Sequence, residues 1–317
     1  MNEGPIENKL KLREAWLQHN RNSISRLFTL IEKTVHEINP GMPLGFMTGD
    51  RFFEGYDFDN WAKLLEGPDK SPVMWRPGGG YYLDTNTGEL AGKSHDIGRQ
   101  VSQLPEEILS IQSEIENFPY QRLKKAANIV VLEACSHIAA GCTGAAFNVL
   151  SMYDEPLDEY ESLVACLYKA RPFFDLMVRS LGRSPITGVQ TFWNKNCFAA
   201  GNLTGGDWFT SFAPVVRHEI YDIGLPASYS NNHAQVTILG KDDVFALSKE
   251  EIENRKFRRT CEEGTIIKFG SLTDDELEKR FDKLVDFWVA ERQRELEEEG
   301  TGSISKTGSI EKIEVRP

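Results

Sequence analysis

The feature that most constrains this chain is a regular alternation of short apolar segments and longer amphipathic segments over residues 1–183. The apolar segments begin near residues 43, 73, 109 and 143, which are 30, 36 and 34 residues apart, and each is typical of a buried parallel strand. Between them, apolar residues recur at intervals of three and four, as in amphipathic helices. Because a helical crossover makes two successive strands parallel, the pattern predicts an α/β fold with a parallel sheet.

The pattern changes after residue 184, where we place a domain boundary. Further strands are predicted over 186–194, 225–229, 235–240 and 265–270, and helices over 207–221, 248–257 and 274–299. The predicted organisation is a first domain over 1–183, a second over 184–272, a charged helix over 273–299 and a flexible tail over 300–317.

Composition excludes several classes of partner. The 48 acidic and 36 basic residues give a net charge of −12, which argues against nucleic acid or an anionic membrane as the main partner. No apolar run reaches the roughly 20 residues of a membrane helix, and the first residues do not resemble a secretory signal. The five cysteines form no CxxC pair, so we expect reduced thiols and a cytoplasmic location. The six histidines lack metal-ligand spacing, and we predict neither a metal nor a cofactor.

The segment SEIENFPY carries the strongest candidate site residues. Glu114 and Glu116 are two positions apart, so on a strand they point to the same face, at the end where parallel sheets hold their active sites. Two carboxylates there suit nucleophilic or acid–base catalysis, and Asn117 and Tyr120 follow them. The alternative is that both glutamates are solvated loop charges, or charges at the start of the next helix.

The segment WRPGGGYY is the second candidate. Arg76 follows an apolar strand, and three glycines allow close backbone approach to a ligand, while Trp75, Tyr81 and Tyr82 can stack on a sugar ring. No Gly-Lys-Ser/Thr follows, so this is not a phosphate-binding P-loop. The alternative is an ordinary turn beside core aromatic residues. The expected open end of the sheet also includes Asp50 and Asn148. Among the histidines, only His95, near the glycines, is a candidate.

Several longer runs resemble bacterial glycoside hydrolases related to the family 42 beta-galactosidases. They are RPGGGYYLD, SEIENFPYQRLKKAANIVVLEACSHIAAGCTGAAFNVL, GVQTFWNKN and GLPASY…AQVTILGKDDVFALSKEEI. The resemblance covers roughly residues 10–257. It implies a fold in which a (β/α)8 barrel precedes a flavodoxin-like trimerisation domain.

On this resemblance, the four apolar segments correspond to strands five to eight of the barrel. The chain is then a partial (β/α)8 barrel followed by a partial flavodoxin-like domain. The family's nucleophile falls on Glu114, with Glu116 as second choice, while its acid/base glutamate lies on the fourth strand, for which this chain has no counterpart. The implied function is retaining hydrolysis of O-glycosidic bonds on a carbohydrate substrate, in a homo-oligomer that is a trimer by resemblance.

Two other functions remain open from the sequence. One is a truncated, non-catalytic unit that binds carbohydrate or forms oligomers through the residues after 184. The other is an unrelated α/β enzyme whose acidic rim holds Mg²⁺.

Overall fold

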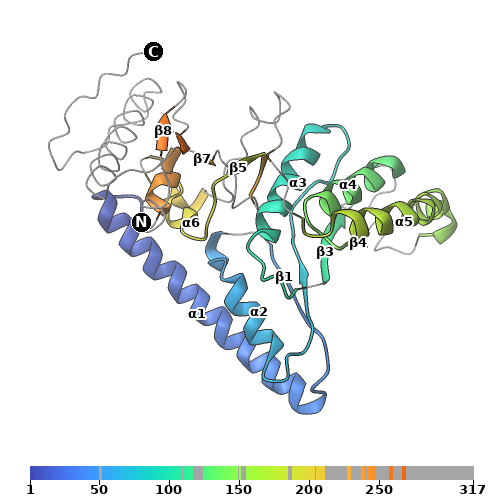
Figure 1. Cartoon of the computed structure of the whole chain (residues 1–317), viewed down its shortest axis with the longest axis horizontal. Helices are drawn as coiled ribbons and strands as arrows, with labels where there is room; N and C mark the ends of the chain where they lie inside the picture. Colours follow the sequence, from blue (N-terminus) through green and yellow to red (C-terminus); the bar gives the residue numbers. More distant parts are fainter. Residues whose placement is uncertain are drawn as a thin grey trace.

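A computed structural model of the chain describes residues 1–49, 52–108, 110–116, 124–148, 150, 155–184, 188–203, 205–210, 227–229, 237–239, 241–247, 257–259 and 266–268. The chain is an α/β protein with two sheets, as the alternating pattern predicts. Figure 1 shows the first sheet flanked by the helices α1 to α5 and the second sheet near the N-terminus.

The first sheet is parallel and its strands lie side by side in chain order. Its register places Phe46 beside Trp75 and Trp75 beside Ile111, and places Glu116 beside Asn148. The four strands are β1 (Leu44–Met47), β2 (Val73–Arg76), β3 (Ser110–Glu116) and β4 (Gly144–Asn148). All four predicted strand positions in the first domain are therefore confirmed.

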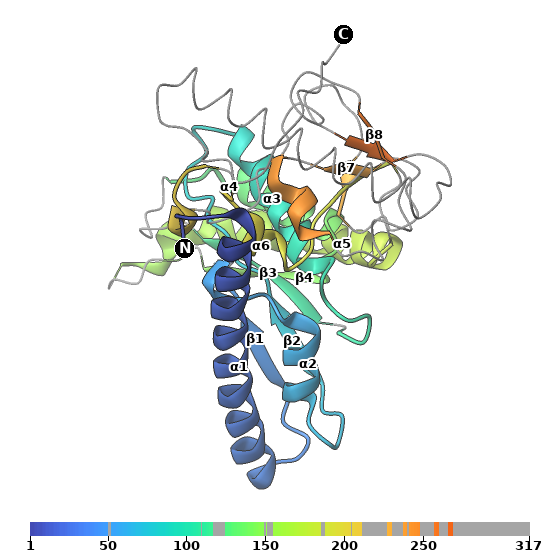
Figure 2. The same cartoon turned by 90° about the vertical axis from the view of Figure 1, so that its left-hand side faces the viewer.

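Helices precede and connect these strands. They are α1 (Ile6–Ile38), α2 (Phe58–Glu66), α3 (Gly88–Val101), α4 (Ala127–Ala139) and α5 (Glu161–Leu181), with 3-10 turns η1 (Phe52–Glu54) and η2 (Leu157–Tyr160). A glycine directly follows two of these helices: Gly67, with a φ of 65°, after α2, and Gly182 after α5. Figure 2 shows α1 and α2 running alongside β1 and β2.

The two faces of the first sheet differ in what covers them. One face buries Trp75, Ile111 and Ile115 against the helices, within aromatic and aliphatic core clusters. The other, which we call the open face, is formed by alternate residues of the same strands, and none of its described side chains belongs to a hydrophobic core cluster. It carries Met47, Met74, Arg76, Gln112, Glu114, Glu116 and Asn148. The open face is thus the surface on which the candidate carboxylates lie.

The second sheet has the order β6-β5-β7-β9-β8. Strand β5 pairs in parallel with β6 and β7, whereas β9 is antiparallel to β7 and to β8. The strands are β5 (Val189–Thr191), β6 (Ala227–Ser228), β7 (Thr237–Leu239), β8 (Phe257–Arg259) and β9 (Ile266–Lys268). Short helical turns accompany them: α6 (Cys197–Ala200), η3 (Trp208–Thr210) and η4 (Lys241–Ala246).

Sequence reasoning missed β8 and α6. Residue 257 was expected to end a helix and instead begins β8. No element was predicted over residues 195–200, which contain α6. Most of the predicted helices over 207–221 and 248–257, and all of that over 274–299, lie outside the described residues, as does the tail over 300–317.

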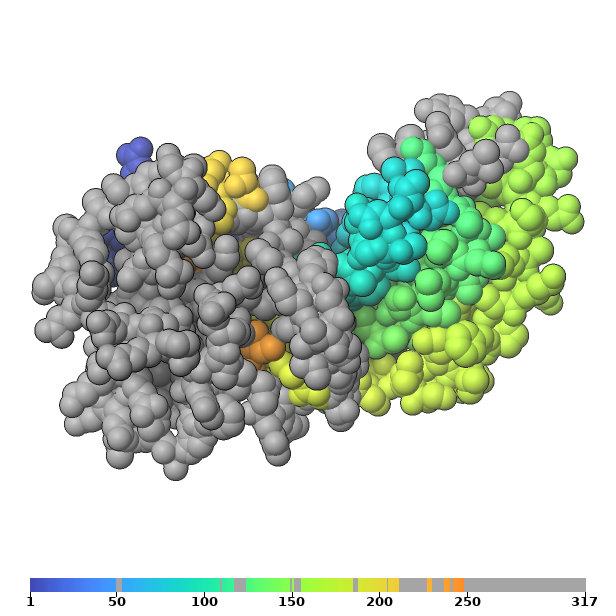
Figure 3. All heavy atoms as spheres, turned by 90° about the horizontal axis from the view of Figure 1, so that it is seen from above, coloured from blue at the N-terminus to red at the C-terminus, as the bar shows by residue number. Residues whose placement is uncertain are grey.

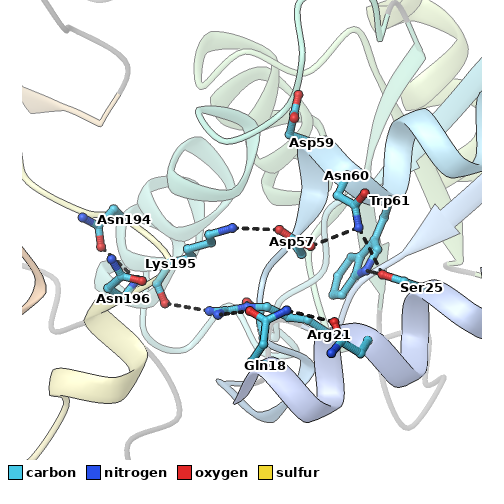
Figure 4. Close-up of polar contacts among 12 residues, drawn as sticks. Gln18, Arg21, Ser25, Asp57, Asp59, Asn60, Trp61, Asn194, Lys195 and Asn196 are labelled. Atoms are coloured by element: carbon cyan, nitrogen blue, oxygen red, sulfur yellow. Dashed lines mark hydrogen bonds and ion pairs between the residues drawn. The ribbon is translucent and has the colours of Figure 1, made fainter. Parts of the chain in front are cut away.

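Helix α1 joins the two sheets. The buried guanidinium of Arg13 donates hydrogen bonds to the carbonyl oxygens of Ala199 and Gly201, at 3.0 Å and 2.7 Å. Further along α1, Arg21 contacts the carbonyl oxygen of Lys195, whose ammonium pairs with Asp57 at 2.8 Å; Figure 4 shows this chain of contacts. The largest hydrophobic cluster also extends from the first sheet's helices to the region after β5.

Among the described residues, no helix is both long enough and apolar enough to cross a membrane.

Candidate functional site

The site is centred on Glu114, near the carboxyl end of β3. Its carboxylate accepts a hydrogen bond from the guanidinium of Arg76, the last residue of the neighbouring strand β2. The Glu114 side chain is 14% exposed and that of Arg76 is 36% exposed, so the pair is partly open to solvent. Because this hydrogen bond joins two charged groups, Arg76 both orients Glu114 and balances its charge.

The glycine bend of residues 78–80 lies against this pair. A Cβ atom at Gly78 would collide with the carbonyl oxygen of Thr48 and would lie 3.5 Å from the Glu114 carboxylate. Gln100 of α3 holds the bend in place. Its side-chain amide accepts a hydrogen bond from the Gly78 backbone N–H at 3.1 Å and donates one to the Gly78 carbonyl oxygen at 2.7 Å. The ends of β1, β2 and β3 can approach one another this closely because residue 78 has no side chain.

Glu116 is the second carboxylate of the site. It ends β3, on the same face as Glu114, and lies beside Asn148 at the end of β4. Two residues along a strand advance about 6.6 Å, so the backbone separates the two glutamates by roughly that distance. The sequence therefore correctly placed Glu114, Glu116, Arg76 and Asn148 at the carboxyl end of the sheet.

A buried ionic network lies on the helix-covered side, behind Glu114. Lys93 donates to the backbone carbonyl oxygen of Glu114 at 2.7 Å and to the Glu133 carboxylate at 2.8 Å. The other oxygen of Glu133 accepts from Lys125 at 2.6 Å, and these three side chains are at most 2% exposed. Burial is the largest cause that lowers the pKa of Lys125, while Glu133 opposes it.

This network was not predicted. Lys93 lies 40 positions before Glu133 in the sequence, and charged residues are ordinarily solvated. The one usable signal was Glu133 itself, a single acid within the otherwise apolar segment ANIVVLEACSHIA of α4. Two lysines share one carboxylate, which leaves an excess positive charge buried beneath the end of β3.

His137 borders the network from the next turn of α4. It is fully buried, and neither ring nitrogen has a hydrogen-bond partner. Burial lowers the pKa of His137 well below its usual value, and the positive charges of Lys93 and Lys125 lower it further. His137 is therefore a neutral core residue.

Two aromatic residues do not support the predicted sugar contacts. Trp75 is 1% exposed and packs among Phe46 and Phe58, on the face of the sheet opposite Glu114. Tyr81 is also 1% exposed, and the Lys125 ammonium lies over its ring at 4.8 Å. The prediction that these two residues stack on a sugar is therefore wrong. Alternation along β2 turns Trp75 into the core, and Tyr81 is buried next to the ionic network.

The remaining predicted residues have separate outcomes. Tyr82 is 39% exposed and contacts Gly80 in the bend, so its ring remains accessible. Asp50, Asn117 and Tyr120 lie outside the described residues.

His95 lies away from the candidate site. Its ring packs against Tyr229 with centroids 4.4 Å apart, beside a cavity of about 380 Å³ between α3, α4 and β6. The cavity is lined mainly by small residues, including Ala91, Gly98 and Ala140, and contains neither Glu114 nor Arg76. Figure 3 shows α3, α4 and α5 side by side on this part of the surface, in cyan, green and yellow-green.

Within the described ranges, no group of three or more His, Cys, Asp and Glu side chains could hold a metal ion. No family model, curated protein or solved structure matches the chain.

Proposed function

We propose that this chain is a component of a retaining glycoside hydrolase in which Glu114 is the nucleophile. The observation that carries the proposal is the Arg76–Glu114 pair at the carboxyl end of a parallel sheet, beside the bend at Gly78. Catalytic residues of parallel β/α barrels occupy this end of the strands. A carboxylate on an open, partly solvated face can reach a sugar ring, whereas one in the helix-covered core cannot.

The proposed fold is half of a (β/α)8 barrel. The strands lie in chain order and the core clusters occupy one face, whereas a doubly wound sheet reverses its strand order and has helices on both faces. In the second sheet, the parallel order β6-β5-β7 is the order with which a flavodoxin-like sheet begins. The antiparallel strands β8 and β9 depart from that fold. Trimer formation and a cytoplasmic location remain proposals that derive from the sequence.

The chemistry follows from two carboxyl groups. The ionised Glu114 oxygen attacks the anomeric carbon, and the glycosidic C–O bond breaks while a carboxylic acid protonates the leaving oxygen. Water then attacks the covalent glycosyl–enzyme ester, and the second carboxylate accepts the proton of that water, which frees Glu114. Glu116 is the described carboxyl group nearest in sequence on the same face, and Tyr82 and Asn148 are placed to contact the sugar.

The test uses a panel of aryl glycosides with the full chain. We expect Glu114→Gln to abolish turnover and to keep the wild-type far-UV circular dichroism, while Glu107→Gln, at an exposed position before β3, leaves turnover unchanged. A 2-deoxy-2-fluoro aryl glycoside is expected to add one fluorosugar to the peptide that contains Glu114, as measured by mass spectrometry. Unchanged turnover in Glu114→Gln would remove Glu114 from the mechanism.

A non-catalytic carbohydrate-binding unit is the second candidate. It is favoured by the fact that both described carboxylates on the open face come from one strand, β3, whereas the family resemblance requires a second from another strand. Sugar binding without hydrolysis by the wild-type chain would select this candidate.

A further inference from the structure

Helix α5 exposes apolar side chains on the side that points away from the first sheet. On its inner side, Leu163 and Phe174 are buried in a core cluster shared with α4 and the sheet. Tyr168 lies on the opposite side of the helix, because successive residues turn by about 100°, and it is 81% exposed. Val164 and Leu176, one turn before and two turns after it, are 52% and 50% exposed. Surface helices ordinarily present polar residues to solvent, so this side of α5 is typical of a protein–protein contact.

The position of α5 in the molecule leaves room for such a contact. Figure 1 shows α5 at the end of the molecule farthest from the second sheet, and Figure 3 shows it along the outer rim of the same end. The exposed side of α5 faces away from the first sheet as well, so it stays exposed whatever covers the open face. A second molecule can therefore reach α5 without meeting either sheet.

The residues on this side of α5 are spaced symmetrically along the helix. Glu161, Tyr168, Pro172 and Arg179 follow one another at intervals of seven, four and seven positions, and all four are exposed. These intervals place the four side chains within about 40° of one another around the helix axis. Position 170 is the midpoint both of the two central residues and of the two charged ones. Reversing the helix direction therefore keeps the spacing and exchanges the acid at one end for the base at the other.

We infer that α5 packs against α5 of a second copy of this chain, antiparallel to it, across a two-fold axis at position 170. In this arrangement Tyr168 lies over Pro172 of the partner subunit, and Glu161 faces Arg179 of the partner subunit. The two-fold axis makes each contact occur twice. A parallel pair of helices would instead bring the two Glu161 carboxylates together and the two Arg179 guanidinium groups together, so charge selects the antiparallel arrangement.

The other side chains of α5 are consistent with this pairing. Arg171 and Asp175 form an ion pair with each other at 2.9 Å, so their charges are balanced within one helix. Tyrosine is among the residue types enriched at the centres of interfaces, and Tyr168 is next to the axis. One helix of 21 residues, about 30 Å long, is a small contact, so we expect a dimer with a dissociation constant in the micromolar range.

The two end charges also have an effect inside a single copy. Glu161 is in the first turn of α5 and Arg179 is in the last, where each complements the helix dipole. Exchanging the two charges removes that effect from both ends of the helix. It restores the opposite charges across the two-fold axis, however, so an exchange of charges separates the two roles.

The experiment measures self-association of the full chain by sedimentation equilibrium. Tyr168→Glu is expected to raise the dissociation constant by at least about 30-fold. Glu161→Arg and Arg179→Glu should each raise it by about tenfold, because each turns two ion pairs into two like-charge contacts. The double substitution is expected to return it to within about threefold of the wild-type value. Lys33→Glu, at an exposed position of α1, makes the same change of charge as Arg179→Glu and should have no effect.

Each result supports or overturns the inference. A wild-type chain that stays monomeric at about 100 μM would overturn it, because micromolar association is then excluded. A dimer that persists in Tyr168→Glu would place the contact elsewhere. A double variant that associates no better than the two single variants would leave only the helix-dipole effect, and would overturn the antiparallel pairing. Far-UV circular dichroism of each variant at the wild-type level confirms that α5 is still folded.

The inferred contact is independent of the proposed trimer and of the proposed chemistry. A trimer would form through the residues after 184, at the opposite end of the molecule from α5. Where both contacts form, Tyr168→Glu reduces a hexamer to a trimer, and a trimer that no α5 substitution changes would overturn the inference. Loss of glycoside turnover in Glu114→Gln leaves the association constant unchanged, so the two proposals fail separately.

Discussion

The guanidinium of Arg76 and the carboxylate of Glu114 form an ion pair across the ends of two adjacent parallel strands. The pair lies at the solvent-facing end of the sheet, whereas the Glu114 backbone is held from the opposite side by Lys93. Glu114 is therefore fixed by contacts on both sides of β3, which is the positioning that a catalytic carboxylate requires.

The first prediction concerns Arg76. Replacement by methionine removes a charge-assisted hydrogen bond of about 1.5–3 kcal/mol, so aryl glycoside turnover is expected to fall by roughly 10-fold to 100-fold. Because Arg76 is partly exposed, the free energy of unfolding in urea should change by no more than about 1 kcal/mol. Arg76→Lys keeps the positive charge without the planar guanidinium and should recover part of the rate. Full activity in Arg76→Met would show that the pair does not position Glu114 for catalysis.

The second prediction concerns the buried network. In Glu133→Gln, Lys93 and Lys125 lose the carboxylate that they share, and both ammonium groups remain in a low-dielectric interior. We expect the free energy of unfolding to fall by about 3–5 kcal/mol, measured by urea denaturation. The control is Asp59→Asn, which breaks the exposed pair with Lys63 and should cost less than about 1 kcal/mol. Equal effects of the two substitutions would contradict a structural role for the network.

The third prediction is a pH dependence caused by His137. Its pKa is lowered in the folded protein, so below a pH of about 6.5 the unfolded chain binds a proton that the folded chain does not. Folding stability should therefore decrease as pH falls from about 6.5, by up to about 1.4 kcal/mol per pH unit, until the lowered pKa is reached. In His137→Leu this contribution disappears, which urea unfolding at several pH values would detect.

Two other histidines matter for that experiment: His36 contributes an opposing pH dependence, and His19 provides a control variant. The pKa of His36 is raised, chiefly by its hydrogen bond to the Met42 carbonyl and then by that to Glu32, so His36 stabilises the fold at low pH and loses this effect as pH rises. The two contributions oppose each other, and the His137 effect must be taken as the difference between wild type and variant. His19→Gln, on the exposed side of α1, should keep the wild-type pH profile. The same profile in His137→Leu would contradict the prediction.

Local sequence patterns were sufficient to locate the strands of the first sheet and to place the site residues at the carboxyl ends of those strands. The spacing of the apolar segments set the strand positions, and period-two alternation placed Glu114 and Glu116 on one face. The same alternation turns Trp75 inward, because Arg76 and Trp75 are neighbours and cannot both face the site.

Contacts between distant residues could not be predicted in this way. Lys93, Lys125 and Glu133 meet only because α3, the segment before α4 and α4 itself pack behind β3. Likewise β8 is stabilised by its pairing with β9, since its sequence FRR has no apolar alternation of its own. Tertiary pairing determines its conformation more than local propensity does.

The hydrogen bonds from Arg13 to the backbone around α6 tie the beginning of the chain to a region almost two hundred positions later. Helix α1 consequently packs on both sheets: its later turns contact the first sheet and its first turns contact the region of α6 beside the second. A segment that replaced the part after residue 184 would have to place backbone carbonyl groups at the same positions around α6 to keep the Arg13 hydrogen bonds. The helix at the start of the chain is therefore expected to be exchangeable only together with the second sheet.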